Sequence, residues 1–252
     1  MEKFIPCRKC KKKAGSSLPE GYYIGDNGLA VECRHHIVWK KAAELERKML
    51  RRGFSKDALN WTPESYKGTK SKNDFERLLK YSSLFSTDKV NDAKKCFIYI
   101  YGPNGTQKTS AAQGIGKIIN ESGIDCRYIL MKSLIDNLWK SQRDEQIEEE
   151  IRELADCDVL ILDEAFSKDK IHIWASGNQL GYIDEFLRER INNGKGCIFI
   201  SNNLPTEIEN QGFSHSLQDL VTREIKKQNA LLTFVDNYFD SISEEEIPES
   251  LF

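Results

Sequence analysis

The sequence predicts a doubly wound α/β domain with a five-stranded parallel sheet, preceded by a small cysteine-rich domain. Short β-branched or aromatic runs alternate with helical stretches between residues 93 and 240. Strands that are separated by helices pair in parallel through right-handed crossovers. One of these strands runs directly into a glycine-containing loop and a helix. Three cysteines and two histidines lie ahead of this pattern, within the first 36 residues.

The expected elements follow from the spacing of the apolar residues. Five buried runs predict strands at 96–101, 126–130, 159–162, 197–201 and 231–235. Helical spacing between these runs predicts helices at 108–122, 132–140, 146–154, 180–192 and 217–227. Folds of this kind bind their ligands at the carboxyl ends of the strands, so we expect the functional residues there.

Changes in composition divide the chain into four parts. A basic amphipathic helix at 38–52, followed by Gly53, closes the first part, and residues 61–72 have linker composition ahead of a helix at 74–83. Residues 240–250 carry five acids and no base. The expected parts are an N-terminal domain at 1–60, a linker with a helix at 61–92, the α/β domain at 93–240 and an acidic tail at 241–252.

Length and charge exclude several classes of protein. The chain has 252 residues, with 37 Lys and Arg against 39 Asp and Glu, so its formal charge is -2. A surface that binds nucleic acid all over is excluded, whereas a local basic patch is allowed. The apolar runs fall far short of the roughly 20 residues that span a bilayer, and the N-terminus has no secretory apolar region. We therefore expect a cytoplasmic protein without a membrane partner, whose cysteines are thiols or metal ligands.

The loop after the first expected strand has the spacing of a phosphate-binding loop, GxxxxGK[ST], with Gln107 in place of the second glycine. Its backbone N–H groups would face the phosphates of ATP, Lys108 would reach the terminal phosphate oxygens, and Thr109 would offer a hydroxyl to Mg²⁺. The expected nucleotide-binding residues are Gly102, Pro103, Asn104, Gly105, Thr106, Gln107, Lys108, Thr109 and Ser110. A side chain at position 107 would crowd this pocket or alter the dihedral angles of the loop.

Polar residues follow two further strands. Asp163 and Glu164 end the run at 159–162, and we expect Asp163 to hold Mg²⁺ and Glu164 to activate the attacking water. Asn202 and Asn203 end the run at 197–201, where an amide can sense the terminal phosphate, and we favour Asn203. Arg223, on a later helix, is a candidate arginine finger toward a neighbouring subunit.

The N-terminal cysteines have the spacing of a metal site. Cys7 and Cys10 form one pair, and Cys33 with His35 or His36 forms the other. Three thiolates and one imidazole suit tetrahedral Zn²⁺, and a domain of about 50 residues with few large apolar side chains needs such a staple. The spacing leaves open which histidine binds. The cysteines at 96, 126, 157 and 197 lie in or beside expected strands and are assigned to the core.

A basic cluster follows the second expected strand. Lys132, Lys140 and Arg143 lie on or just after the helix at 132–140, close to Trp139. Basic groups bind the backbone of single-stranded DNA, and an aromatic ring can stack on its bases. At helical spacing with Leu134, Ile135 and Leu138, an aromatic residue such as Trp139 is more often part of the core.

Taken in order, the phosphate loop, the Asp-Glu pair, the strand-terminal Asn and the helical Arg resemble the AAA+ ATPases. Within them the chain resembles the DnaC/DnaI-type helicase loaders and the IstB-type transposition helpers. The stretches 128–138, 186–195 with 200–204, and 220–223 carry this resemblance, which covers roughly residues 93–227. Two positions depart from the family pattern: Gln107 stands where a glycine is usual, and Asp219 stands where a further arginine is common.

The resemblance implies an ATPase that loads a replicative hexameric helicase onto single-stranded DNA. It also implies self-association through the ATPase domain, an N-terminal domain that holds the helicase, and Arg223 acting in trans. Two alternatives stay open at this point. One is a transposition helper whose partner is a transposase, and the other is an adaptor that binds nucleotide with little or no hydrolysis, which the glutamine at 107 favours.

Overall fold

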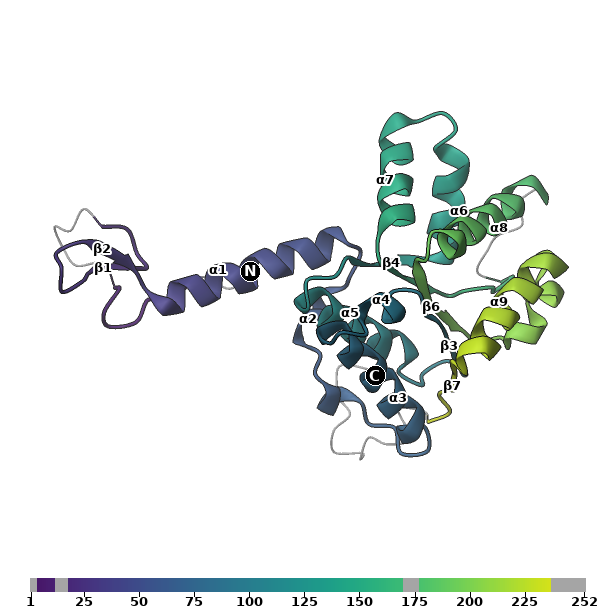
Figure 1. The fold of residues 1–252 in the computed structure, drawn as a ribbon, viewed down its shortest axis with the longest axis horizontal. Helices are drawn as coiled ribbons and strands as arrows, with labels where there is room; N and C mark the ends of the chain where they lie inside the picture. Colours follow the sequence, from purple (N-terminus) through teal and green to yellow (C-terminus); the bar gives the residue numbers. More distant parts are fainter. Residues whose placement is uncertain (1–3, 12–17, 170–176, 237–252) are drawn as a thin grey trace, which may run out of the picture. The chain divides into compact units, whose positions relative to one another are not determined.

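A computed structural model describes residues 4–11, 18–169 and 177–236. For residues 177–179 it describes the backbone only. Contacts divide the chain into two compact units, Met1–Arg51 and Arg52–Phe252, and each is described by itself. Figure 1 gives the elements of both units. The acidic tail expected at 241–252 lies outside the described residues.

The first unit consists of a small hairpin and one long helix. Strands β1 (Tyr22–Ile24) and β2 (Ala30–Glu32) pair antiparallel, and helix α1 (Arg34–Arg51) follows directly. The expected helix at 38–52 therefore begins four residues earlier. This places both candidate histidines in its first turn, directly after Cys33.

The second unit is built on a five-stranded parallel sheet, as expected. The strands are β3 (Phe97–Tyr101), β4 (Cys126–Leu130), β5 (Val159–Asp163), β6 (Gly196–Ser201) and β7 (Leu231–Thr233). Their order across the sheet is β4-β5-β6-β3-β7, and all pairs are parallel. The fold class predicted from the alternation of strands and helices is confirmed. The three central strands carry the most buried runs, which accounts for their strong sequence signal.

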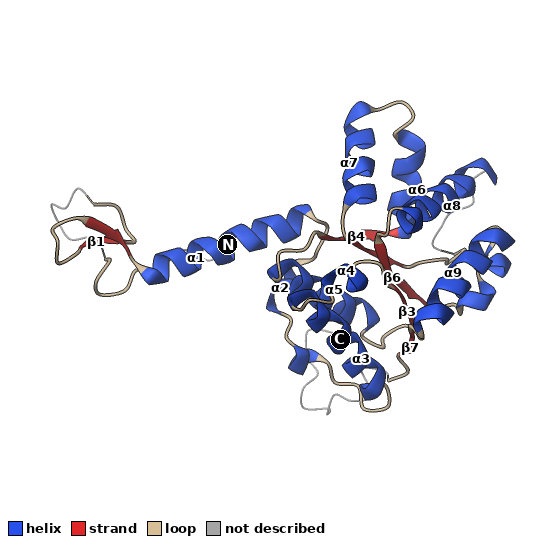
Figure 2. Cartoon of the chain, viewed as in Figure 1, coloured by secondary structure: helices blue, strands red, loops and turns tan. Residues whose placement is uncertain are grey.

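Helices cover the sheet on both faces (Figure 2). They are α2 (Lys56–Asn60), α3 (Lys72–Ser83), α4 (Val90–Ala93), α5 (Lys108–Glu121), α6 (Met131–Lys140), α7 (Glu145–Asp156), α8 (Gly177–Asn192) and α9 (His215–Gln228). Single 3₁₀ turns lie at Pro63–Ser65, Leu84–Ser86, Pro205–Glu207 and Glu209–Gln211. Among the described helices, none has the length and apolarity that a membrane span requires.

The segment ahead of β3 packs on the α/β core. The Trp61 ring lies over Gly114 of α5, where a Cβ would come within 2.1 Å of the ring. Phe75 and Leu78 of α3 are buried as well. Residues 61–92, expected as a linker with a helix, therefore carry apolar side chains that cover α5, although their composition is mostly polar.

One buried cation ties the far end of this core together. The Arg190 side chain on α8 is 1% exposed and donates to four backbone carbonyls, those of Leu154, Ala155, Cys157 and Gly196, at 2.6 to 3.2 Å. These carbonyls belong to the end of α7, the turn into β5 and the start of β6. The guanidinium therefore supplies donors that the backbone at this corner lacks.

Replacing this guanidinium should be costly. We expect Arg190→Met to lower the free energy of unfolding by about 3 kcal/mol or more, because it leaves several buried carbonyls without a donor. Arg188→Met, two residues away on α8, removes a half-exposed ion pair with Asp184 and should cost roughly 0 to 1 kcal/mol. Urea unfolding of both variants measures the difference, and equal losses would contradict the role given to Arg190.

Candidate nucleotide site and cysteine cluster

A cavity of about 430 Å³ lies where β3, β5 and β6 end. The loop residues 104–110 line one side, and Tyr128, Asp163, Glu164 and Asn202 line the others. Its volume is within the range of small-molecule sites. Most of the residues predicted to bind nucleotide therefore meet in one place, because the parallel register brings the strand ends to a common edge.

Gly102 lets the loop pass close to the backbone of Phe234, just after β7, as it leaves β3. The Phe234 N–H donates to the Tyr101 carbonyl at 2.8 Å, and a Cβ at position 102 would lie 1.9 Å from the Phe234 oxygen. Only glycine fits so close to a neighbouring backbone. Gly102 and Pro103 thus shape the loop from outside the cavity, and residues 104–110 face it.

Lys108, the first residue of α5, is buried beneath the loop. Its ammonium donates to the Pro103 carbonyl at 2.5 Å and to the Thr106 hydroxyl at 3.3 Å. Burial lowers the pKa of Lys108 to about 8, and the nearby Asp163 carboxylate opposes this shift. The loop therefore encloses a cation that has given up most of its water, which suits it to bind phosphate oxygens.

Gln107 occupies the glycine position of the loop in a left-handed conformation, with φ 61° and ψ 16°. For a residue with a side chain this costs on the order of 1 kcal/mol. Its carboxamide bonds the backbone of residues 65–67, accepting from the Lys67 N–H at 3.0 Å. The loop thus keeps the dihedral angles that a glycine would provide, and the side chain has a partner of its own.

Asp163 is the centre of the polar network in the cavity. The Thr109 hydroxyl donates to Asp163 Oδ2 at 2.8 Å and the Tyr128 hydroxyl donates to the same oxygen at 2.7 Å. The Glu164 N–H donates to Asp163 Oδ1 at 2.7 Å. The two residues expected to hold Mg²⁺, Thr109 and Asp163, are therefore in direct contact, and Glu164 lies beside them.

Sequence reasoning did not single out Tyr128 as a site residue. Burial, reinforced by the Asp163 carboxylate, raises the pKa of Tyr128, so its hydroxyl stays a donor. The sequence placed Tyr128 in an expected strand but could not show which strand lies beside it. In the structure β4 pairs with β5, and Tyr128 lies opposite Ile161, two residues before Asp163.

The two strand-terminal asparagines have different partners. The Asn202 amide donates to Asn104 Oδ1 at 2.7 Å and lines the cavity. The Asn203 amide donates to the Phe166 carbonyl at 3.0 Å, and its backbone N–H donates to the Ser201 hydroxyl. The structure therefore brings Asn202 to the loop, while Asn203, the favoured candidate, holds the chain after Glu164.

The remaining candidates lie on the surface. Arg223 of α9 is outside the cavity, with its side chain 68% exposed and its Nε 3.3 Å from Glu224 Oε1. Lys132, Lys140 and Arg143 are exposed on or after α6. Trp139 is 40% exposed, and the Arg143 guanidinium lies 5.9 Å from the centre of its ring. The Arg143 guanidinium and the Trp139 ring thus lie side by side at the surface, and Lys132 and Lys140 are exposed on the same helix.

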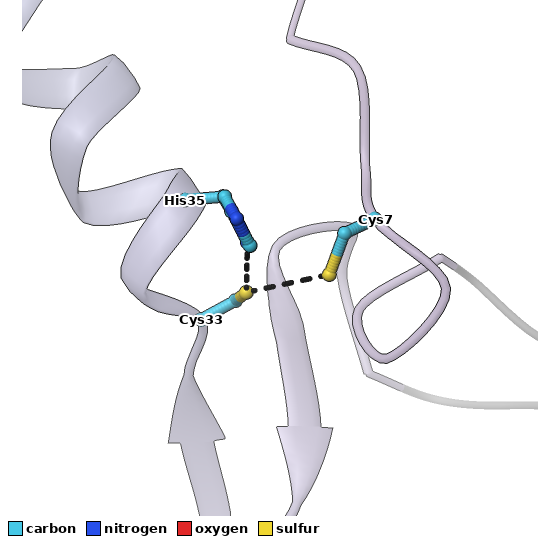
Figure 3. A group of neighbouring side chains, drawn as sticks. All are labelled: Cys7, Cys33 and His35. Carbon is cyan, nitrogen blue, oxygen red and sulfur yellow. Dashed lines mark hydrogen bonds between the residues drawn. The ribbon is translucent and has the colours of Figure 1, made fainter.

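Two of the N-terminal thiols, those of Cys7 and Cys33, lie beside His35 (Figure 3). Cys7 Sγ lies 3.6 Å from Cys10 Sγ and 3.7 Å from Cys33 Sγ, and Cys33 Sγ lies 3.5 Å from His35 Nδ1. His36 Nδ1 instead lies 2.9 Å from Glu32 Oε1, and the His36 ring stacks on Trp39. The helix turn that carries both histidines directs only His35 to the sulfurs.

These distances fit a tetrahedral metal ion. With zinc bonds of about 2.3 Å to sulfur and 2.0 Å to nitrogen, neighbouring ligand atoms are about 3.8 Å and 3.5 Å apart. Backbone N–H groups of Cys10 and Lys9 lower the pKa of the Cys7 thiol to about 6, which favours the thiolate that a metal needs. Cys7, Cys33 and His35 fall within 4.8 Å of one another, and Cys10 adjoins them through Cys7.

Comparison with known proteins agrees with this architecture. The family model described as IstB-like ATP binding protein matches residues 41–217. The crystal structure of the DnaC helicase loader is similar over 71% of this chain and 99% of its own, at 22% identity and a TM-score of 0.55. AMPPCP-bound DnaA from Aquifex aeolicus is similar over 69% of this chain, at 18% identity and a TM-score of 0.53.

Domain III of the Thermotoga maritima replication initiation protein DnaA is similar over 71% of this chain and 67% of its own, at 18% identity and a TM-score of 0.51. The present chain spans 50% of the Aquifex DnaA chain. No curated protein matches its sequence. At these identities the solved structures establish a shared AAA+ fold.

The bond from Tyr128 to the acid can be tested by removing one oxygen. Tyr128→Phe keeps the ring and leaves Asp163 with one donor fewer, so we expect the free energy of unfolding to fall by about 1.5 to 3 kcal/mol. Tyr101→Phe, at the end of β3, should change it by less than about 0.5 kcal/mol. Urea unfolding without nucleotide compares them, and a Tyr128→Phe protein as stable as the wild type would refute the bond.

Proposed function

Because the chain belongs to the IstB-like ATP-binding family, we propose that it is an ATP-driven loader that delivers a replicative hexameric helicase onto single-stranded DNA. The observation that carries the proposal is the contact between Thr109 and Asp163 at the mouth of a phosphate loop that encloses Lys108. A hydroxyl and a carboxylate in contact beside a buried cation are what a magnesium nucleotide requires. The likeness to the DnaC helicase loader over nearly all of that chain supports the choice of partner.

In this proposal each residue of the cavity has one task. The N–H groups of the loop and Lys108 bind the phosphates, and Thr109 with Asp163 would hold Mg²⁺, which neutralises charge on the phosphates when bound. Glu164 accepts the proton of the attacking water. The geometry favours Asn202 as the amide that contacts the terminal phosphate, with Asn203 holding the segment of Glu164 and Phe166 in place.

Self-association is proposed from the exposure of Arg223. On α9, outside its own cavity, a largely exposed guanidinium is free to reach a site on another copy. There it would stabilise the charge that develops on the transferred phosphate. ATP binding would in this way be linked to assembly.

The DNA surface is proposed on α6. Lys132, Lys140 and Arg143 supply the charge for a phosphate backbone, and the half-exposed Trp139 ring can stack on a base. The N-terminal unit is proposed as a zinc module that holds the helicase, with Cys7, Cys10, Cys33 and His35 as ligands. The sulfur and nitrogen distances given above support this ligand set over one with His36.

A transposition helper is the second candidate, because the matching family is the IstB-like one. It shares the nucleotide chemistry and differs in its partner, a transposase. Affinity capture on a replicative helicase and on a transposase separates the two.

Loading can be measured directly. With ATP and single-stranded DNA present, we expect the wild-type protein to deposit a hexameric helicase on the DNA. Lys108→Ala should reduce deposition at least tenfold because it removes the cation of the phosphate loop, and Cys7→Ser should reduce it by undoing the N-terminal unit. Lys195→Ala, which removes a long, partly exposed ion pair with Asp158 just before β6, serves as the control and should load normally. Equal deposition by the wild type and Lys108→Ala would exclude an ATP-driven loader.

The metal assignment has its own test. We expect one zinc per chain by elemental analysis, and His35→Ala should lower the affinity for zinc at least tenfold, since it removes a ligand. His36→Ala should keep the metal because that ring lies beside Glu32, outside the cysteine cluster. Loss of zinc from His36→Ala alone would overturn the assignment.

A further inference from the structure

The segment of residues 62–71, called the strap here, runs beside the phosphate loop. Asp236, just after β7, fixes one end of it: the Asp236 carboxylate accepts from the Lys70 and Ser71 N–H groups at 2.8 and 2.7 Å, and from the Thr69 hydroxyl at 3.3 Å. The Ser71 hydroxyl in turn accepts from the Val235 N–H at 2.8 Å. The far end of the strap is therefore attached to the edge of the sheet.

Packing fixes the middle of the strap. The Tyr66 ring stacks on Phe75 of α3 with 4.1 Å between the ring centres, and lies edge-on to Phe234 at 5.4 Å. Phe234 is also the residue whose backbone passes over Gly102. The strap and the start of the phosphate loop thus share one neighbour.

Gln107 joins the strap to the loop directly. Its Oε1 accepts from the Lys67 N–H at 3.0 Å, and its Nε2 donates to the Ser65 carbonyl at 3.5 Å. These are backbone groups on both sides of Tyr66, and a glycine at position 107 would leave them without this partner. Gln107 makes both bonds while its backbone is in the left-handed conformation.

We propose that Gln107 is a positioning residue, which ties the strap to the phosphate loop and so holds the loop ready for the phosphates of a nucleotide. The inference rests on the proposed nucleotide site. It explains why a side chain is tolerated at a position where the motif has glycine. The left-handed conformation of Gln107 is strained, but its side chain forms hydrogen bonds to the strap, which Asp236 already holds in place. Loop and strap then move as one body when nucleotide binds.

Hydrogen exchange at the Lys67 amide reads the attachment. In Gln107→Gly we expect this amide to exchange faster, while the amides of Lys70 and Ser71 keep their protection because Asp236 still holds them. Gln218→Ala removes a similar glutamine bond, to the Glu209 N–H far from the cavity, and should leave Lys67 unchanged. Unaltered exchange at Lys67 in Gln107→Gly would overturn the proposal.

A double-mutant cycle on nucleotide affinity reads the consequence. Calorimetry with Mg²⁺ and ATP should find Gln107→Gly about fivefold weaker than the wild type, the value of roughly one net hydrogen bond. The urea midpoint of unfolding of Gln107→Gly should change little, because the strain that glycine relieves offsets the lost hydrogen bond. In an Asp236→Ala background, where the strap is released, Gln107→Gly should weaken binding no further.

The outcomes are distinct. A fivefold loss that persists in the Asp236→Ala background would mean that Gln107 acts without the strap, and would overturn the proposal. Affinity that Gln107→Gly leaves unchanged or improves would overturn it as well. A wild-type protein that takes up no nucleotide would instead contradict the proposed function. The exchange experiment at Lys67 needs no nucleotide, so it would still test the bond between Gln107 and the strap.

Discussion

The parallel pairing of β3, β5 and β6 is the constraint on which the site depends. Register places Tyr101 beside Ser201 and aligns β5 with β6, so the residues that follow each strand emerge at one edge. The loop, the acidic pair and the strand-terminal amides are separated by long stretches of sequence and still meet around one cavity. A shift of one residue in this register would turn Asp163 away from Thr109.

At that edge the polar groups are hydrogen-bonded to one another. Lys108 donates to the loop's own oxygens, and the Asp163 carboxylate accepts from Thr109, Tyr128 and the following N–H. Buried polar groups need such partners, and a phosphate or a cation would have to replace them. The network thus keeps donors and acceptors in position at a site made for charged ligands. Asp236 holds the segment ahead of β3 near the same edge, and the Trp61 ring packs that segment on α5.

The sequence was sufficient for the five strands of the parallel sheet, the longer helices and most of the cavity, because these follow from apolar periodicity and a motif with fixed spacing. It was insufficient wherever side-chain direction decides. Asn202 and Asn203 are chemically equal in a sequence, and only the turn after β6 sends one to Asn104 and the other to Phe166. His35 and His36 are likewise equal in the sequence, and only their places in the first turn of α1 send His35 to Cys33 and His36 to Glu32. Gln107 could be recognised as an anomaly, but its partners lie 40 residues away, in a segment whose composition resembles a linker.

The most direct test of the account is calorimetric titration of the full chain with ATP in the presence of Mg²⁺. The geometry of the loop, Lys108 and Asp163 predicts saturable uptake of one nucleotide per chain, lost when Mg²⁺ is chelated or when Asp163 is replaced by alanine. Well-folded protein that binds no nucleotide, alone or together with a hexameric helicase, would contradict the account.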